Sequence, residues 1–341
     1  MMKSIHKTLN IGHRVFKKYP ERTGGVVVLF ESWLEYCREQ SMSMDVIDAN
    51  SHNYSSKAVA FFSIIWQIIC KMKRCDTIFL HGTIRDYIVF APFIVWLARC
   101  RHKRVVMRKF AGNFAEIYEG SNMPVRMLLQ YALTHADVTC WETKALVEYG
   151  KKFNVNSVWF PNVRRDTGVR RGPRPYQCRL VFLSRVEKEK GIFTLIEAMK
   201  KLGAGYSLDI YGPLNGIEKA VLSGMNYHYQ GCVPAHEVPS VLSQYDLLVL
   251  PTTWDTEGYP GIIIEAYGVG LPVIATFVGA IPEIVEEGIT GFLIPPSDCG
   301  ALVLAVQRFE GDNYHRFSAS ALDAFGIFDY DKTNRRIADL L

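Results

Sequence analysis

One stretch of the chain, Thr256–Ala275, constrains the possible folds more than any other segment. It reads TEGYPGIIIEAYGVGLPVIA and follows an apolar strand candidate, DLLVLP, at Asp246–Pro251. Gly270 is placed to end a helix, and PVIAT at Pro272–Thr276 is typical of the next strand. A strand, a short polar loop, a helix and a second strand make one parallel βαβ unit. The segment therefore predicts a parallel α/β sheet.

Two glutamates lie on either side of the start of this helix. Parallel sheets bind ligands at the carboxyl ends of their strands, and Glu257 lies in the loop at that end. Glu265 lies about two turns further on, within the helix that Pro260 and Gly261 open. Free backbone N–H groups and the positive end of the helix dipole suit a phosphate there. Carboxylates beside a phosphate site suit polyol hydroxyls, because each charged hydrogen bond contributes about 1.5–3 kcal/mol.

At these residues the chain resembles the retaining glycosyltransferases of family 4, which have the GT-B fold of two doubly wound Rossmann-like domains. Glu257 and Glu265 match the Glu–seven residues–Glu motif of that family. The resemblance is close from about Pro161 to Pro296 and looser before it. Four further segments match in the same order: LSRVEKEKGIFTLIEA (Leu183–Ala198), DIYGP (Asp209–Pro213), YQGCVP (Tyr229–Pro234) and VGAIPEIVEEGITGFLIPP (Val278–Pro296).

The resemblance implies roles for the residues around the motif. Arg185 and Lys190 match the Arg and Lys that hold the donor diphosphate, where each cation stabilises the transition state by about 2–4 kcal/mol. Glu265 would bond the ribose hydroxyls of the nucleotide, and Glu257 the donor sugar. Two fixed cations in place of a divalent ion predict catalysis without a metal or another cofactor. The backbone that would cradle the sugar and phosphate belongs to Gly258, Tyr259, Pro260, Gly261 and Ile262.

The rest of the chain predicts two domains of this α/β type. Strand and helix patterns alternate on both sides of PNVRRDTGVRRGPRPYQC (Pro161–Cys178), which is rich in Pro, Gly and Arg and predicts an interdomain linker. We therefore predict an acceptor-binding domain over residues 1–165 and a nucleotide-sugar-binding domain over 166–322. In the family, a C-terminal segment corresponding to residues 323–341 crosses back to the first domain.

The first domain offers fewer candidate site residues. His81 ends the strand DTIFLH, where it is expected either to face the cleft as a sugar ligand or acid–base group, or to be a satisfied core histidine. Gly24 and Gly25 close the sequence RTGG (Arg22–Gly25), and they either let the backbone approach the donor or form a plain turn. Where many family members have a His after the strand KRVVMR, this chain has Arg108, Lys109 and Phe110.

Two acidic patterns outside the motif have open or structural interpretations. Glu283 is expected either to interact with a helix terminus or to bind a ligand. Asp329 and Asp331 form a DxD, which is a metal site in other transferases. It lies at the start of the terminal segment, so we interpret it as a helix entry and predict no metal site.

The distribution of charge distinguishes the two halves. Residues 1–165 hold 24 Lys and Arg against 13 Asp and Glu, while residues 166–341 hold 15 against 21, which gives net charges of +11 and −6. Two apolar helix candidates, Phe61–Cys70 and Tyr87–Ala98, end in the basic runs Lys71–Arg74 and Arg99–Arg104. Both are shorter than the roughly 18–20 residues of a membrane span. Basic residues beside an apolar face favour an anionic membrane surface, and core helices with solvated ends are the alternative.

Together these patterns predict a retaining hexosyltransferase. It would move a hexose unit from a nucleoside diphosphate sugar to a hydroxyl of a saccharide acceptor, lipid-linked, in capsule, O-antigen or exopolysaccharide synthesis. Scattered cysteines and the basic surface predict a cytoplasmic protein, peripheral on the inner face of the cell membrane, and no nucleic-acid module accompanies the charge. The alternatives are a nucleotide-sugar epimerase of the same fold and a catalytically silent scaffold.

Overall fold

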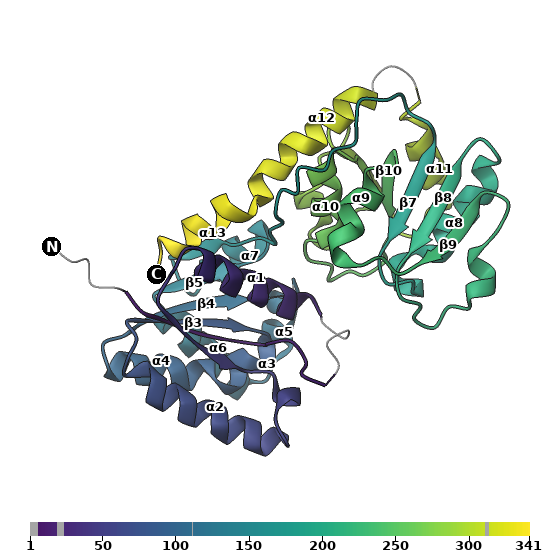
Figure 1. Cartoon of the computed structure of the whole chain (residues 1–341). Coiled ribbons are helices and arrows are strands. Elements are labelled where there is room, and N and C mark those ends of the chain that lie inside the picture. The colour runs from purple at the N-terminus through teal and green to yellow at the C-terminus, as the bar shows by residue number, and fades with distance from the viewer. Residues whose placement is uncertain (1–5, 19–23, 111, 311–313) are drawn as a thin grey trace. The chain divides into compact units, whose positions relative to one another are not determined.

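The computed structural model describes residues 6–18, 24–110, 112–310 and 314–341, and it divides the chain into two compact units (Figure 1). Unit 1 comprises Met1–Asn162 and Asp331–Leu341, and unit 2 comprises Val163–Tyr330. Each unit contains one six-stranded parallel sheet with helices on both faces. The predicted fold class, two doubly wound α/β sheets, is thereby confirmed.

The strand order of unit 1 is β2-β1-β3-β4-β5-β6. The chain runs outward from β1 to β2 and then returns to pair β3 with the other side of β1. The carboxyl ends of β1 and β3 therefore form the topological switch point, where such sheets bind ligands. The strands are β1 (Thr8–Gly12), β2 (Met44–Asp48), β3 (Thr77–Gly82), β4 (Arg104–Lys109), β5 (Val138–Trp141) and β6 (Ser157–Trp159).

Helix α1 covers one face of this sheet, and α2, α4 and α6 cover the other (Figure 1). The helices of unit 1 are α1 (Gly25–Glu39), α2 (Lys57–Met72), α3 (Ile84–Val89), α4 (Ala91–Cys100), α5 (Phe114–Gly120), α6 (Met123–His135), α7 (Lys144–Gly150) and α13 (Tyr330–Ala338), with a short 3₁₀ helix η2 (Ser51–Asn53).

The helix predicted over Tyr87–Ala98 is wrong as a single element, because α3 ends at Val89 and α4 begins at Ala91. Pro92 is the cause. Proline has no backbone N–H to donate to the carbonyl one turn earlier, and its ring clashes with that carbonyl, so a helix cannot continue through it. The first turn of a new helix tolerates proline, because N–H groups there have no intrahelical acceptor. The break places α3 directly after the switch point of the sheet.

The strand order of unit 2 is β12-β11-β10-β7-β8-β9, so its switch point lies between β7 and β10. Helices α8 and α11 pack together, while α9 and α12 pack against α10. The strands are β7 (Arg179–Leu183), β8 (Ser207–Tyr211), β9 (Tyr227–Gly231), β10 (Leu247–Leu250), β11 (Val273–Thr276) and β12 (Gly291–Ile294). The helices are α8 (Ile192–Leu202), α9 (Val238–Leu242), α10 (Gly261–Val269), α11 (Cys299–Gln307) and α12 (Tyr314–Phe325), with the short 3₁₀ helices η3 (Lys188–Lys190), η4 (Lys219–Leu222), η5 (Ala235–Glu237), η6 (Ile281–Glu283) and η7 (Gly326–Phe328).

The segment predicted as a linker, Pro161–Cys178, is largely fixed to unit 2. A guanidinium nitrogen of Arg171 lies 2.7 Å from a carboxylate oxygen of Asp246, just before β10, and both side chains are buried. Asp246 also accepts the backbone N–H groups of Gln177 and Arg179 at 3.0 Å each. A charge inside a protein needs partners of this kind. The segment showed no apolar periodicity because an arginine, rather than an apolar side chain, is its buried anchor.

The C-terminal stretch is divided between the two units. Helix α12 packs against α10 in unit 2, whereas Asp331–Leu341 belongs to unit 1. There Arg336 donates to the backbone oxygen of Trp159 at 2.6 Å, and the hydroxyl of Thr77 donates to that of Leu341 at 2.8 Å. None of the helices in the described residues combines the length and apolar character that crossing a membrane requires.

Candidate active site

The candidate site of unit 2 is built by the loops that follow β7 and β10. Gly191, just after η3, has φ +76°, and a Cβ at this position would lie 1.8 Å from the backbone oxygen of Pro251. Only glycine therefore lets the loop after β7 touch the end of β10. The backbone N–H of Thr253 donates to the carbonyl of Glu189 at 2.8 Å, which ties the two loops together. Lys190, between Glu189 and Gly191, is thus held at the switch point.

Lys190 and Glu257 form an ion pair across these loops. Their side chains are only 9% and 15% exposed, so the pair is largely shielded from solvent. The hydroxyl of Thr252 donates to the same carboxylate oxygen at 3.3 Å. The carbonyl of Glu257 accepts the N–H of Ala280 at 2.8 Å, which fixes the loop against the end of β11. Charge and backbone contacts together hold the Glu257 carboxylate in place.

Glu265 has a cationic partner that the sequence did not indicate. The guanidinium Nε of Arg164 lies 2.5 Å from its carboxylate, and each side chain is 25% exposed. A Cβ at Gly261, the first residue of α10, would lie 1.8 Å from another guanidinium nitrogen of Arg164. Gly261 therefore gives Arg164 access to the N-terminus of α10. The first N–H groups of that helix lack intrahelical acceptors, so a cation, a carboxylate and free donors lie together.

The remaining predicted residues of the second domain lie near these groups. Arg185 lies two residues beyond the end of β7, where its side chain is 55% exposed and lies 3.1 Å from a carboxylate oxygen of Glu187. Tyr259 is buried, and its hydroxyl donates to Glu283 at 2.5 Å. Glu283, which lies in the first turn of the 3₁₀ helix η6, thus holds the loop before α10. Gly258, Pro260 and Ile262 belong to the same loop and first helical turn.

His81 is fully buried in unit 1 rather than facing a cleft. Its ring lies among those of Phe30, Trp33, Phe79 and Phe110, with centroid separations of 4.8, 6.0, 3.9 and 6.2 Å. Neither ring nitrogen has a hydrogen-bond partner among the residues that the structure describes. Among the described residues, His81 is therefore not a satisfied core histidine, and its role as a sugar ligand or acid–base group stays a prediction.

The residues at the carboxyl end of β4, and Phe110 after it, take part in the same buried region. The guanidinium of Arg108 lies 3.5 Å from the ring centroid of Phe160 and 4.8 Å from that of Phe110. Burial lowers the pKa of Arg108 to about 10 and that of Lys109 to about 8. Burial and the charge of Arg108 hold the pKa of His81 well below its usual range. These departures from the family pattern thus build a basic, aromatic core at the carboxyl end of β3 and β4.

Gly24 and Gly25 lie at the start of α1, and Arg22 and Thr23 of the same motif lie outside the described residues. Gly24 is the N-cap of α1 in an extended conformation, and a Cβ at either glycine would meet none of the described residues within 4 Å. Within the described part of the chain, neither glycine is thus required by a close contact.

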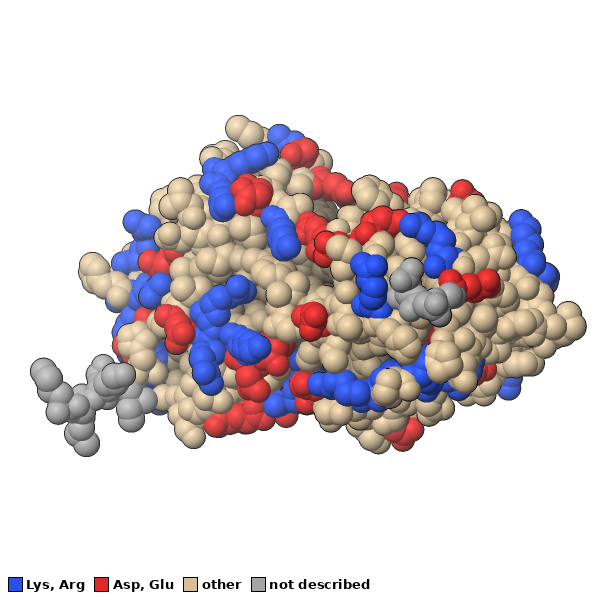
Figure 2. Space-filling view, turned by 90° about the horizontal axis from the view of Figure 1, so that it is seen from above, with Lys and Arg blue, Asp and Glu red and all other residues tan. Residues whose placement is uncertain are grey.

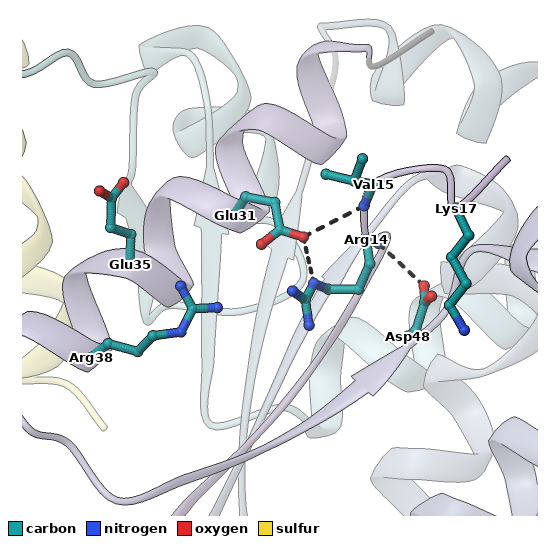
Figure 3. A pocket seen from close by; sticks show the side chains of 7 residues that line it. All are labelled: Arg14, Val15, Lys17, Glu31, Glu35, Arg38 and Asp48. Carbon is teal, nitrogen blue, oxygen red and sulfur yellow. Dashed lines mark hydrogen bonds and ion pairs between the residues drawn. The ribbon is translucent and has the colours of Figure 1, made fainter. Parts of the chain in front are cut away.

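A charged groove lies along α1 and the end of β1 (Figure 3). Arg14 is paired with Glu31 of α1, and its backbone N–H donates to Asp48 at 3.2 Å. Three basic side chains face three acidic ones, so the groove has no excess of either charge. Its lining residues are Arg14, Val15, Lys17, Glu31, Glu35, Arg38 and Asp48.

The acidic DxD lies where the terminal segment enters α13. Asp329 follows η7, and Asp331 lies in the first turn of α13, as the interpretation of a helix entry requires. Within the described ranges, no three His, Cys, Asp or Glu side chains are grouped so that they could hold a metal ion. The independence of the reaction from metal stays a prediction.

The chain has two doubly wound sheets, and charged pairs lie at the switch point of unit 2. This architecture is that of a two-domain protein of the GT-B class. Residues 177–312 match the family described as glycosyl transferases group 1. This match lies within unit 2 and covers less than half of the chain. The narrower assignment to family 4 stays a prediction.

Several relatives and solved structures are similar to this chain. A 41.2 kDa protein in the cps region of Klebsiella pneumoniae is 25% identical over 79% of this chain and 77% of its own length. The amylovoran biosynthesis glycosyltransferase AmsK of Erwinia amylovora is 31% identical over 48% of this chain and 44% of its own length.

Structural likeness extends over nearly the whole chain. HepE of Anabaena, solved in complex with UDP, has a TM-score of 0.74 at 16% identity, covering 98% of this chain and 99% of its own. The lipopolysaccharide outer core galactosyltransferase WaaB has a TM-score of 0.73 at 14% identity, covering 98% of this chain and 100% of its own. At these identities the likeness establishes the GT-B fold.

Proposed function

We propose that the protein is a retaining glycosyltransferase that moves a hexose unit from a nucleoside diphosphate sugar to a hydroxyl of a saccharide acceptor. The observation that carries this proposal is the ion pair between Lys190 and Glu257 at the switch point of unit 2, in the loop that leads to α10. A cation and a carboxylate side by side suit a ligand with both phosphates and hydroxyls. Similarity of residues 177–312 to group 1 glycosyl transferases supports the same activity.

In the proposed chemistry, each of these groups binds a different part of the donor. Lys190 and Arg185 stabilise the negative charge that develops on the leaving diphosphate, assisted by the N-terminus of α10. Glu257 accepts hydrogen bonds from hydroxyls of the transferred sugar, and Glu265 from the ribose. No carboxylate is assigned as a nucleophile, so the acceptor attacks the face from which the diphosphate departs, and the anomeric configuration is retained.

We place this reaction in the synthesis of a surface polysaccharide such as a capsule, O-antigen or exopolysaccharide. Support comes from AmsK and from the Klebsiella protein of the cps region, whose names refer to such polymers. A growing polymer of this kind is lipid-linked, so the enzyme would work in the cytoplasm at the inner face of the membrane.

Exposed aromatic side chains on unit 1 support a peripheral contact with that membrane. Phe62 and Trp66 of α2 are 69% and 67% exposed, and Trp96 of α4 is 53% exposed. Aromatic rings of this kind favour the membrane interface. Lys and Arg are interspersed with Asp and Glu on the face in Figure 2, so charge alone marks no single docking surface there.

The basic runs lie at one edge of the sheet. Lys71–Arg74 precedes β3, and Arg99–Arg104 ends at the first residue of β4, so both runs belong to the amino edge, opposite the switch point. Lys71 donates to the carbonyl of Val46 at 2.8 Å and Arg101 to that of Ile69 at 3.0 Å, so part of each run supports the fold. The rest of these runs is available to anionic lipid at the ends of α2 and α4.

A panel of UDP-, GDP- and ADP-sugars tests the proposal. We expect one donor to be hydrolysed slowly without acceptor and transferred in its presence, with the product anomer observed by NMR matching the donor. EDTA should leave most of the activity intact, because two protein cations take the place of a metal. Absence of binding by every nucleotide sugar, or an inverted product, would contradict the proposal, and an absolute need for Mg²⁺ or Mn²⁺ would contradict its metal-free form.

A further inference from the structure

A second pocket, in unit 1, lies at the switch point of that sheet. It has a volume of about 430 Å³, and residues directly after β1, β2 and β3 line it, among them His13, Asn50 and Thr83. The N-terminal half of α2 and helix α3 complete its wall. Parallel sheets bind ligands at this place, so its chemistry indicates what unit 1 recognises.

One side of the pocket is a hydrogen-bonding pair. The Nε2 of His13 lies 2.9 Å from a carboxylate oxygen of Asp86. The same oxygen accepts the backbone N–H and the hydroxyl of Thr83 at 2.8 and 2.7 Å, which fixes the buried Asp86. The Nδ1 of His13 has no hydrogen-bond partner among the described residues. An imidazole oriented by a carboxylate, with its second nitrogen unused, suits a ligand hydroxyl.

The rim of the pocket carries cations without counter-ions. The side chains of Lys57 and Arg85 line it, are exposed, and form no ion pair or hydrogen bond within the described parts of the chain. Burial lowers the pKa of His13, but its hydrogen bond to Asp86 and the charges of Asp86 and Asp48 outweigh this and leave the pKa raised. The pocket thus has an excess of positive charge, unlike the balanced groove of Figure 3.

The opposite wall is apolar. Phe61 of α2 stacks on Phe90 with ring centroids 6.0 Å apart, and Phe16, Ile64 and Val89 extend the same surface. Phe61 also precedes the exposed Phe62 on α2, so the wall is continuous with the helix that we propose to contact the membrane. A purely polar sugar would leave this wall uncovered.

We infer that this pocket binds the acceptor as a lipid-linked saccharide joined through phosphate, with its first lipid carbons on the Phe61 wall, its phosphate at Lys57 and Arg85, and a sugar hydroxyl at His13. The inference rests on the proposed glycosyltransferase function and names its acceptor class. The phosphate and the sugar hydroxyl would each meet a group that has no partner among the described residues, and the lipid would cover the apolar wall. Asp86 acts as a positioning residue for His13.

Calorimetric titration of the full chain with soluble probes tests this inference without a membrane. The probes are n-decyl phosphate and n-decyl β-D-glucoside, both below their micelle concentrations, and inorganic phosphate. Decyl phosphate should bind at least tenfold more tightly than inorganic phosphate. The double variant Lys57→Gln/Arg85→Gln should weaken decyl phosphate at least tenfold and decyl glucoside less than threefold.

A matched control removes two charges from the other end of the same helix. Lys73→Gln/Arg74→Gln should leave the affinity for decyl phosphate within twofold of wild type. His13→Asn should weaken decyl glucoside at least fivefold, and Phe61→Ala should weaken both decyl compounds. Failure of decyl phosphate to bind, or equal affinity in the Lys57/Arg85 variant, would overturn the inference.

A nucleoside diphosphate titrated into the same samples separates the two proposals. Unit 2 should bind it equally well in every variant of the pocket. If it binds but the pocket variants behave like wild type, the acceptor inference fails while the proposed function stands. If no nucleoside diphosphate binds wild type, the proposed function itself fails.

Discussion

The ammonium group of Lys190 and the carboxylate of Glu257 are paired, although the two residues belong to loops that follow different strands, β7 and β10. Neighbouring parallel strands bring their carboxyl ends to one edge of the sheet, so residues 67 positions apart meet there. The pair joins the group proposed for the diphosphate to the group proposed for the sugar. A change in either one should therefore affect the other.

Removal of the diphosphate cations should reduce turnover. Lys190→Ala and Arg185→Ala should each lower the rate of donor cleavage by at least about a hundredfold, because each loses a few kcal/mol of charge stabilisation. Lys190→Ala should also lower the free energy of unfolding by about 1–3 kcal/mol, because it leaves the Glu257 carboxylate without its partner. The exposed Arg185 should have little effect on stability. Rate assays and urea unfolding measure the two effects.

The neighbouring Lys188 provides the matched control for this pair of variants. Lys188→Ala removes the same charge from η3 but is out of register with the motif, and it should retain near-normal turnover. Normal activity in a folded Lys190→Ala or Arg185→Ala variant would remove that residue from the mechanism.

Substitutions of Glu257 and Glu265 should have different effects on nucleotide affinity and on the rate of transfer. Glu265→Gln should weaken nucleotide binding at least about tenfold, because its proposed partner is the ribose. Glu257→Gln should mainly reduce transfer, because its proposed partner is the sugar being moved. Calorimetry with the free nucleotide and transfer assays compare the variants, with the exposed Glu286→Gln as control. Equal losses of nucleotide affinity in the two variants would refute the division of roles.

Local patterns were enough to predict the sheets and the position of the second-domain motif. Runs such as RLVFLS and DLLVL are apolar and bounded by turn residues, and they became β7 and β10. Their carboxyl ends then had to lie together because parallel strands share an edge. Pro92 marked the break between α3 and α4, although the apolar run around it was predicted as one helix.

Partners distant in sequence could not be predicted in this way. Arg164 reaches Glu265 across 101 positions, and no periodicity connects them. His81 was placed correctly at a strand end, but its exclusion from solvent depends on rings from α1 and from the loop after β4, such as Phe30 and Phe110. A strand-end position fixes the edge of the sheet, whereas tertiary packing decides whether the side chain meets solvent.

Asp246 should be one of the most sensitive positions for stability. Asp246→Ala should lower the free energy of unfolding by about 3–5 kcal/mol, because it leaves the buried guanidinium of Arg171 without a counter-charge. Asp166→Ala removes an exposed carboxylate paired with Arg170, and it should cost less than about 1 kcal/mol. Urea unfolding compares the two. A similar small loss in both would show that the pair does not anchor the segment before β7.

His81 should make unit 1 sensitive to acid. The folded protein keeps His81 neutral, whereas in the unfolded chain it binds a proton below about pH 6.5. Its contribution to stability is therefore complete above that pH and decreases as the pH falls, by up to about 1.4 kcal/mol per pH unit. His81→Phe should reduce this slope by a similar amount between about pH 6.5 and 5.5 in urea unfolding.

The exposed His102 provides the control, and His102→Asn should leave the slope unchanged. The raised pKa of His13 contributes with the opposite sign, but it does so in wild type and variant alike and cancels in the comparison. An unchanged slope in His81→Phe would show that the buried ring becomes protonated without unfolding.

The basic amino edge of unit 1 should bind anionic vesicles. Arg99, Lys103 and Arg104 line one hollow together with two histidines and a single carboxylate, Asp137, and the excess of positive charge there attracts a lipid surface within a Debye length of about 8 Å. Binding should fall steeply with added salt and be small on neutral lipid. Arg99→Gln/Lys103→Gln/Arg104→Gln should reduce it at least about fivefold, while Arg101 is kept because it donates to a backbone carbonyl.

Vesicle sedimentation measures this binding, and nucleotide affinity provides the internal control. The triple variant should bind a nucleoside diphosphate as well as wild type does, because the proposed donor site lies in unit 2. Trp66→Ser should weaken attachment even at high salt, since an exposed indole contributes apolar area that salt does not screen. If wild type shows no preference for anionic lipid, the basic edge does not dock on a membrane. If Trp66→Ser sediments like wild type, α2 is not the inserted helix.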